Sequence, residues 1–479
     1  MSDFFHGVRS MQFSSKSPAA AAMSGIPFVI GAAPVHTVSG AVNKPILAES
    51  YDSAVEQLGY SSEWDQFDLC EAMDGLFRLY SCSAVVFVNV LDPKKHKKSG
   101  QEAEVSFTGH TAAISALAIK ESVTVKSGDT SYVCGKDYEL IYDTEKGILV
   151  IDALKDGAIN TESPVTVSYD EVDPSAVTKE DIIGGFDPDA KTSSGIELVD
   201  SVFPLYRIIP DLILAPKWSC QPEVAAVMAA KAEAINTLFP AKALIDADCT
   251  NVSYFKDVPV WKNDNGITDK NQMVCWPMAT QAGKRYHMSI HLAGVIAQVD
   301  RDNGDCPCES PSNKTMQADG IVLSDGTEVA LDITQANFLN SMGIITALNF
   351  VSGYVAWGNY MACYPENEDI RYSYITVSRM FDWVAKSLIL TYWFKVDKSI
   401  RRRLIDSIVD AVNLWLNGLT GDGKIYGGRV EFRDDENSQK DLLAGIARFH
   451  IYLMPTIPMQ EIDFMLECDI SYIESALAA

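Results

Sequence analysis

The chain has 479 residues, of which 47% are hydrophobic and 22% are charged, and its formal net charge is −25 at pH 7. This length exceeds what one hydrophobic core usually supports, so we expect several domains, and the composition excludes a disordered chain. The acidic charge argues against nucleic-acid binding, because contacts with phosphates need Lys and Arg.

Ten cysteines follow no spacing framework, which indicates reduced thiols in a protein made in a cytoplasm. No signal peptide is predicted, because Gly25, Pro27 and Gly31 interrupt the small apolar stretch near the N-terminus. Apolar runs such as residues 388–394 are too short to span a bilayer.

Residues 1–24 lack helical periodicity and indicate an extended arm. Residues 1–48 carry Arg9, Lys16 and Lys44 against a single acidic residue, Asp3. A slightly basic segment on an acidic body could dock on a neighbouring copy, and an ordinary frayed terminus explains the same pattern.

Compact α/β structure is predicted from residue 26 onward. Apolar runs at 27–31, 44–48 and 84–90 predict buried strands. Between the last two we expect two amphipathic helices, one over 51–59 that Ser50 caps and one over 67–80. This order favours a mainly parallel sheet covered by helices.

The basic run at residues 92–100 interrupts this pattern. A solvated linker explains it better than a nucleic-acid site, given the acidic context. Beyond it, short alternating segments separated by turn signals predict an inserted antiparallel β-sandwich or small barrel. These segments are 104–108, 113–119, 122–126, 138–142, 148–151 and 165–169.

The α/β pattern then resumes. We expect a right-handed β-α-β crossover from a strand at 206–214, a helix at 222–238 with Ser219 as a possible cap, and a strand at 243–246. Three further helices are predicted: 286–299, a nearly all-apolar helix at 379–393, and an amphipathic helix at 399–416 that a glycine-rich turn follows.

The C-terminal stretch, residues 430–472, combines strand patterns with two spaced prolines, Pro455 and Pro458. Residues 461–466 alternate like a half-buried or edge strand. An extended strand near a chain end is typical of a protein whose sheet a neighbouring copy completes.

The sequence contains only weak matches to catalytic, phosphate-binding and metal-binding motifs. Residues 418–425 resemble a phosphate-binding loop, but Ile425 stands where Ser or Thr would bind Mg²⁺ and the loop follows a helix. His287 and His291 share a predicted helical face without a third metal ligand, and Cys306 and Cys308 lack a second cysteine pair. We found no G-x-S-x-G elbow, so nothing favours an enzyme, although distant residues can assemble a triad.

Phrases along residues 4–472 resemble those of contractile-phage tail sheath proteins. The C-terminal phrase consists, in this order, of an acidic Asn turn, a glycine, the motif P-x-x-P and the motif E-x-[apolar]-x-F. Two departures are Tyr360, where the family usually has Arg, and Lys217, where it has Gly. The other matching phrases begin with Phe4-Phe5-His6-Gly7-Val8, Gly135-Lys136-Asp137-Tyr138, Ile209-Pro210-Asp211, Gln335-Ala336-Asn337, Val355-Ala356-Trp357-Gly358-Asn359 and Ile375-Thr376-Val377-Ser378-Arg379.

The resemblance implies a structural subunit without cofactor or metal. Six copies would form a ring, and rings would stack around a tail tube and contract to drive it through the host envelope. The implied partners are other copies, the tail tube, and baseplate and terminator proteins, with no nucleic acid and no membrane insertion, in the virion tail and in the host cytoplasm during assembly. The family's central fold resembles subtilisin, but without a matching triad proteolysis is not implied.

Terminal arms would add strands to neighbouring copies. The arm residues that we expect are Phe4, Phe5, Val8, Met11, Phe13, Ile462, Phe464, Leu466, Ile470 and Tyr472. The predicted fold class is mixed α/β and multi-domain, with an inserted β-sandwich or barrel and extended arms. The alternatives are the sheath of a contractile bacteriocin or injection system and, remotely, a cytoplasmic α/β enzyme.

The predicted organisation has six parts along the chain. They are an arm (1–24), a first α/β part (25–100), the inserted β-domain (101–175), a subtilisin-like α/β domain (176–350), a C-terminal α+β domain (351–459) and a second arm (460–479).

Overall fold

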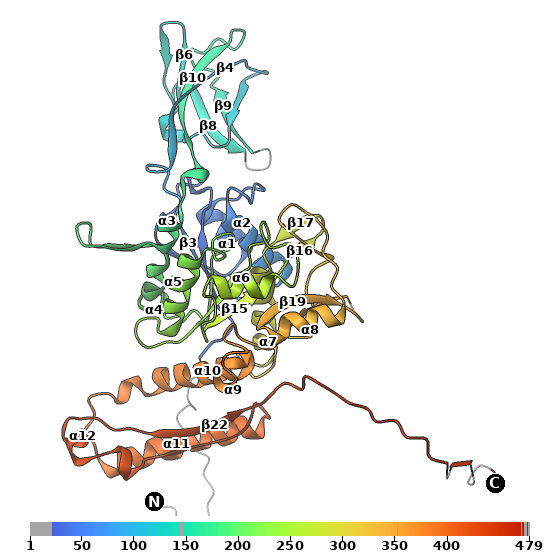
Figure 1. Ribbon diagram of the computed structural model, residues 1–479. Coiled ribbons are helices and arrows are strands. Elements are labelled where there is room, and N and C mark those ends of the chain that lie inside the picture. Colours follow the sequence, from blue (N-terminus) through green and yellow to red (C-terminus); the bar gives the residue numbers. More distant parts are fainter. Residues whose placement is uncertain (1–21, 144–146, 352, 471, 474–476, 478–479) are drawn as a thin grey trace, which may run out of the picture.

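The computed structural model describes residues 22–143, 147–351, 353–470, 472, 473 and 477. A β-rich part, an α/β body and a layer of helices and strands follow one another along the molecule, and a C-terminal segment projects from the last (Figure 1). The mixed α/β, multi-domain character predicted from the sequence is confirmed. The predicted N-terminal arm strand, Phe4 to Phe13, lies outside the described residues.

A central eight-stranded sheet forms the body, in the order β2-β3-β1-β13-β14-β15-β19-β20. Its six inner strands are parallel, and each edge strand is antiparallel to its neighbour. The mainly parallel sheet is therefore confirmed. In sheet order the strands are Pro45–Ala48, Val85–Asn89, Pro27–Gly31, Leu212–Leu214, Lys242–Asp246, Gln272–Cys275, Ile344–Asn349 and Tyr354–Trp357.

Both faces of this sheet are covered, which explains the continuous apolar strands. In β1, Phe28 and Ile30 join one hydrophobic cluster, whereas Val29 joins the cluster on the other face. Helices α1, α2 and α7 cover the Val29 face, and α4, α5 and α6 the opposite face. The bounds are α1 Tyr51–Leu58, α2 Asp68–Met73, α3 Lys179–Ile183, α4 Val199–Tyr206, α5 Pro222–Glu233, α6 Val258–Asp264, α7 Met288–Asp302 and α8 Ile333–Ser341.

Seven strands between β3 and β13 form two antiparallel sheets, β4-β10-β6-β7 and β5-β9-β8. Side chains such as Val125, Leu149 and Val167 from both sheets share a separate hydrophobic cluster. This part lies at one end of the molecule (Figure 1). Its strands are β4 Lys97–Val105, β5 Thr111–Ser115, β6 Thr124–Ser127, β7 Thr130–Tyr132, β8 Tyr138–Asp143, β9 Ile148–Ala153 and β10 Val165–Val172.

The basic run that was predicted as a linker enters this part directly. Lys97 already belongs to β4, and its Nζ lies 2.6 Å from Asp170 on β10. Lys98 pairs with Asp173, and Lys95 pairs with Asp181 in α3 of the body. The run is therefore partly structured, and acidic residues of this chain neutralise it.

The third layer contains α10, α11 and a two-stranded antiparallel sheet, β21-β22. Val412, Leu416 and Leu419 of α11 pack with Trp383 of α10 and Val430 of β21. The elements of this layer are α9 Ile370–Ser373, α10 Ile375–Tyr392, α11 Arg402–Gly421, β21 Ile425–Glu431, α12 Gln439–Leu443 and β22 His450–Pro455. The small strands on the body are β11 Gly185–Asp187, β12 Thr192–Ser194, β16 Met278–Gln281, β17 Lys284–Tyr286 and β18 Gly320–Val322.

The predicted strand at 206–214 is mostly wrong. Only Leu212–Leu214 is a strand. Tyr206 is the last residue of α4, in which Val199 and Val202 face the core at helical spacing, and residues 207–211 connect the helix to the strand. Ser219 does not cap α5. Its hydroxyl binds Asp246, and α5 begins instead with Pro222 at its first position.

Two helix ends also differ from the prediction. The helix predicted at 399–416 runs from Arg402 to Gly421, so two glycines of the expected turn lie inside it, and only Gly423, with φ 73°, makes the turn. The helix predicted at 379–393 is buried only as far as Ser387, and Trp393 is 62% exposed.

A buried lysine fastens α6 to the end of α8 and to the connection that follows β20. The Nζ atom of Lys262 donates to the carbonyl oxygens of Met342, Ala362 and Tyr364, at 2.6, 2.9 and 3.1 Å. We expect Lys262→Met to destabilise the fold by about 1–3 kcal/mol, because one buried and two partly buried hydrogen bonds to carbonyls would be lost. Urea unfolding should show this loss, and the exposed Lys256→Met should change stability by less than about 0.5 kcal/mol.

Candidate functional site: a buried junction and a projecting segment

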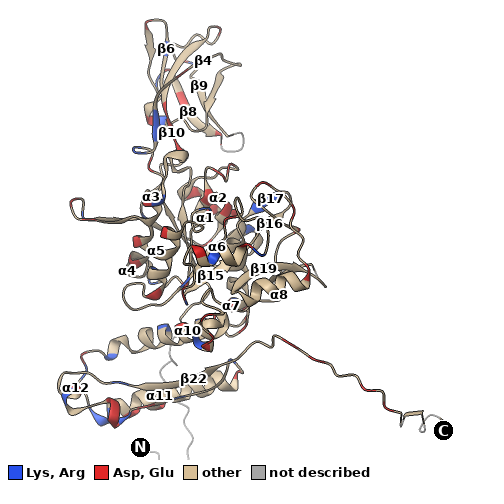
Figure 2. Ribbon diagram, in the orientation of Figure 1, with Lys and Arg blue, Asp and Glu red and all other residues tan. Residues whose placement is uncertain are grey.

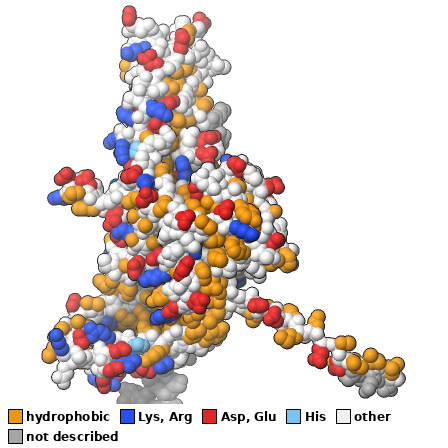
Figure 3. Space-filling view, in the orientation of Figure 1, with side chains coloured by type: hydrophobic (Ala, Val, Ile, Leu, Met, Phe, Trp, Pro, Cys, Tyr) orange, Lys and Arg blue, Asp and Glu red, His pale blue; other side chains and the backbone are white. Residues whose placement is uncertain are grey.

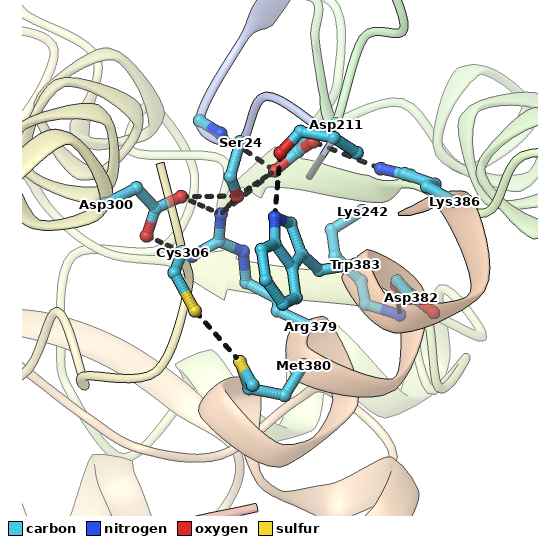
Figure 4. A network of polar contacts seen from close by, with 12 residues as sticks. Ser24, Asp211, Lys242, Asp300, Cys306, Arg379, Met380, Asp382, Trp383 and Lys386 are labelled. Atoms are coloured by element: carbon cyan, nitrogen blue, oxygen red, sulfur yellow. Dashed lines mark hydrogen bonds and ion pairs between the residues drawn. The ribbon is translucent and has the colours of Figure 1, made fainter. Parts of the chain in front are cut away.

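A buried polar network lies where the body meets the C-terminal layer (Figure 4). It joins Asp211 before β13, Asp300 on α7, and Arg379 and Lys386 on α10. Ser24, near the start of the described chain, completes it. The side chains of the four charged residues are each 8% exposed or less.

Arg379 is the centre of this network. Its Nη1 lies 3.0 Å from Asp300, and its Nη2 donates to Asp211 at 2.9 Å and also to Asp300. Lys386 donates to the other oxygen of Asp211 at 3.1 Å. Two cations therefore neutralise two carboxylates, which is the arrangement that a buried charge requires.

The two carboxyl groups respond differently to burial. Burial alone would raise the pKa of Asp211, but Lys386 and Arg379 outweigh it and hold that pKa below its ordinary value. For Asp300 burial dominates over the attraction of Arg379, and its pKa is raised. The guanidinium of Arg379 stays charged, since its carboxylate partners raise its pKa further.

The same network fixes the root of the N-terminal segment. Gly25 N–H donates to Asp211 at 2.9 Å, and the Ser24 hydroxyl donates to Asp300 at 2.7 Å. One turn further along α10, Trp383 donates to the Ala22 carbonyl at 2.8 Å. Residues 22–25 are thus clamped between the central sheet and α10.

The C-terminal segment leaves the same layer from β22. Thr456 donates to the Cys308 carbonyl at 3.0 Å, and Tyr360, the residue that departs from the family phrase, lies 3.3 Å from Gln460. Beyond Gln460 the described chain extends away from the layer (Figure 1). This projecting segment, residues 461–470, carries apolar side chains that solvent surrounds (Figure 3).

The predicted strand at 461–466 is not formed within the chain. These residues are extended and have no strand partner among the described residues, because the segment has left the sheets of its own subunit. Phe464 is 85% exposed and Leu466 97%. The other predicted arm residues at this end are also exposed: Ile462, Ile470 and Tyr472.

A pocket of about 740 Å³ lies beside the carboxyl ends of β13 and β14 and contains the titratable groups that an enzyme would use. These groups are already hydrogen-bonded to one another or to neighbouring residues of the chain. The Nδ1 atom of His287 lies 2.9 Å from Glu71, and its Nε2 accepts from the Lys217 N–H at 3.1 Å. Asp246 is held by the Ser289 N–H at 2.8 Å and by two hydroxyls. These pairs support the pocket wall and leave neither ring nitrogen of His287 free for proton transfer.

The second histidine of the predicted pair is a core residue. His291 is fully buried, and its Nδ1 lies 2.7 Å from the Tyr80 hydroxyl. Within the described ranges no three His, Cys, Asp or Glu side chains are grouped to hold a metal ion. In the same part of the chain no helix is long and apolar enough to cross a membrane.

Comparison with known proteins finds a relative along nearly the whole chain. The tail sheath protein of Burkholderia phage BcepMu is 27% identical over 483 residues, which cover 98% of each chain. That of Escherichia phage P2 is 22% identical over 336 residues, 68% of this chain and 77% of the relative. The chain is therefore similar to tail sheath proteins along nearly its whole length. No protein-family model matches it.

The fold agrees with this assignment. The sheath of an extracellular contractile injection system, in its contracted state, has a TM-score of 0.57 at 12% identity, over 98% of this chain and 99% of that one. Tail sheath proteins are structural, so this chain is a structural sheath subunit and not an enzyme.

Proposed function

We propose that this sheath subunit forms rings of six that stack helically around a tail tube and contract to drive the tube through the host envelope for genome delivery. Its partners would be other copies, the tail tube, and baseplate and terminator proteins. It would work in the virion tail after assembly in the host cytoplasm. The sequence relatives belong to phages, which favours a phage tail over a contractile bacteriocin or other injection system.

The projecting segment is the observation that carries this proposal. A run of exposed apolar residues without a sheet of its own is suited to completing the sheet of a neighbouring copy. In the described part of the chain β21-β22 has only two strands, so each has an outer edge without a strand partner. The arm residues that we assign to strand exchange are Phe4, Phe5, Val8, Met11, Phe13, Ile462, Phe464, Leu466, Ile470 and Tyr472.

The buried junction suits the same function. During contraction the subunits would move as rigid bodies while their arms stay bound to neighbours, so tension would reach each subunit at the roots of its arms. Residues 22–25 are held there by buried hydrogen bonds to Asp211, Asp300 and Trp383. We therefore assign the junction the role of anchoring the N-terminal arm.

We also propose the domain organisation expected from the sequence. It consists of arms at 1–24 and 460–479, α/β parts at 25–100 and 176–350, an inserted β-sandwich at 101–175, and a C-terminal domain at 351–459. The separate cluster that contains Val125 and Leu149 supports the sandwich as an independent unit.

Negative-stain electron microscopy of the purified full-length protein, with and without tail tube, tests the proposal. Hollow striated tubes with six-fold end views are expected as concentration rises. Discrete monomers at every concentration, even when tail tube is added, would contradict it.

A further inference from the structure

The connection from α10 to α11 and the first two residues of α11, together residues 393–403, expose both apolar and basic side chains. Lys395, Lys398 and the three arginines Arg401–Arg403 stand against a single acid, Asp397, in a protein whose net charge is −25. We name these residues the 393–403 patch. Its exposed apolar side chains, with the exposed fraction of each, are Trp393 (62%), Phe394 (64%), Val396 (61%) and Ile400 (40%).

Most of this positive charge is not neutralised by the subunit itself. Arg402 pairs with Asp406 on the next turn of α11. Lys398, Arg401 and Arg403 form no ion pair with any residue that the structure describes. An apolar surface surrounded by such cations fits a partner that is apolar and acidic.

The projecting segment has that composition. Between residues 461 and 470 it carries four acidic residues and no Lys or Arg; they are Glu461, Asp463, Glu467 and Asp469. Its apolar side chains, Phe464 and Leu466 among them, alternate with these acids and are largely exposed. Figure 3 shows acidic and hydrophobic side chains along this segment and no blue ones.

The two surfaces lie at opposite ends of one layer. The C-terminal segment leaves from the β22 end, whereas the turn from α10 into α11 lies at the other end, beside α12, where Figure 2 shows Lys and Arg. The segment extends away from its own patch, so a contact between them joins two copies. Such a head-to-tail contact generates rings or helical arrays.

We propose that the 393–403 patch of one subunit binds the projecting segment of the next. This inference rests on the proposed function and adds a side-chain contact to strand exchange. The cations would set the position of the segment by pairing with Glu461, Asp463 and Glu467, and the patch would bury Phe464 and Leu466 against Trp393 and Phe394.

A charge-swap experiment on the full-length protein tests this proposal. One variant reverses the patch (Lys398→Glu, Arg401→Glu, Arg403→Glu), a second reverses the segment (Glu461→Lys, Asp463→Lys, Glu467→Lys), and a third combines both. Each reversal alone should raise the protein concentration needed for sheath formation with tail tube by at least about tenfold, since juxtaposed like charges cost several kcal/mol. For the combined variant, the protein concentration needed for sheath formation should lie within about threefold of the wild-type value, a margin that allows for imperfect pairing.

Cross-linking locates the contact independently of sheath yield. Cys468 is an exposed thiol on the projecting segment, and Cys134 is another exposed thiol in the β-rich part. In a Cys134→Ser background, Lys398→Cys should give dimers and larger ladders with a short bismaleimide, and the distant control Lys120→Cys should not.

The outcomes separate this inference from the proposed function. If the wild type forms no sheath with tail tube, the proposed function fails. Two results with a wild type that forms sheaths would overturn only the present inference. In the first, the charge reversals have no effect on sheath formation. In the second, the combined variant assembles no better than the patch reversal and Lys398→Cys gives no ladder. A patch reversal that abolishes tube binding without rescue by the segment reversal would assign the patch to the tube instead.

Discussion

Replacing Arg379 by methionine is expected to lower the free energy of unfolding by about 3–5 kcal/mol, because it removes one partner from a buried ion pair. Asp300, which is fully buried, would keep only the Ser24 hydroxyl among the side-chain partners in the described part of the chain. Methionine fills similar space without the charge. Urea unfolding followed by circular dichroism measures the loss.

Two further variants at this site separate charge from shape. Arg379→Lys keeps the charge but lacks the planar fork that reaches Asp211 and Asp300 together, so we expect an intermediate loss. Combining Asp300→Asn with Arg379→Met should cost about 0.5–3 kcal/mol less than the sum of the two single changes. A loss below about 1 kcal/mol for Arg379→Met would mean that the ion pairs do not hold α10 on the body.

The strands of the body were predictable because strands that are buried on both faces are apolar along most of their length. Residues 27–31 are continuously apolar, residues 84–90 are apolar except for Asn89, and both faces of β1 and β3 are indeed covered. The helix α4 was missed because Pro204 interrupts its pattern and the apolar residues that follow resemble a strand. Short elements of this kind depend on their packing more than on local preference.

The junction could not be predicted from spacing, since Asp211 and Arg379 are 168 residues apart. A signal was nevertheless present. Asp211 stands in a phrase otherwise read as a buried strand, and Arg379 and Lys386 stand in a helix that is apolar nearly all round. Charges in such elements must find partners when they are buried, so opposite charges in two predicted core segments indicate that the segments meet.

Sequence alone also could not show that the C-terminal strand lacks a partner in its own chain. Alternation at residues 461–466 describes a segment with one buried face, whether a neighbour or the same subunit covers it. Only the exposed fractions of Phe464 and Leu466 show that the described residues of this subunit do not cover them.

Deleting residues 461–479 is expected to abolish sheath formation and to leave a folded monomer. Ile462, Phe464, Met465 and Leu466 are between 62% and 97% exposed in the subunit, so removing them should change its unfolding free energy by less than about 0.5 kcal/mol. If a neighbour buries these four side chains, the lost contact amounts to roughly 6 kcal/mol or more per subunit. Electron microscopy with tail tube and thermal unfolding of the monomer measure the two effects.

A chain that ends after Ile473 is the matched control, because it keeps Ile462, Phe464, Leu466, Ile470 and Tyr472 and should assemble like the full-length protein. Replacing Phe464 and Leu466 by serine in the full chain should reproduce most of the loss without shortening the backbone. Normal sheaths from the 461–479 deletion would show that this segment is not an assembly arm. Loss of assembly together with an unfolded monomer would mean that the segment stabilises its own subunit, which its exposure argues against.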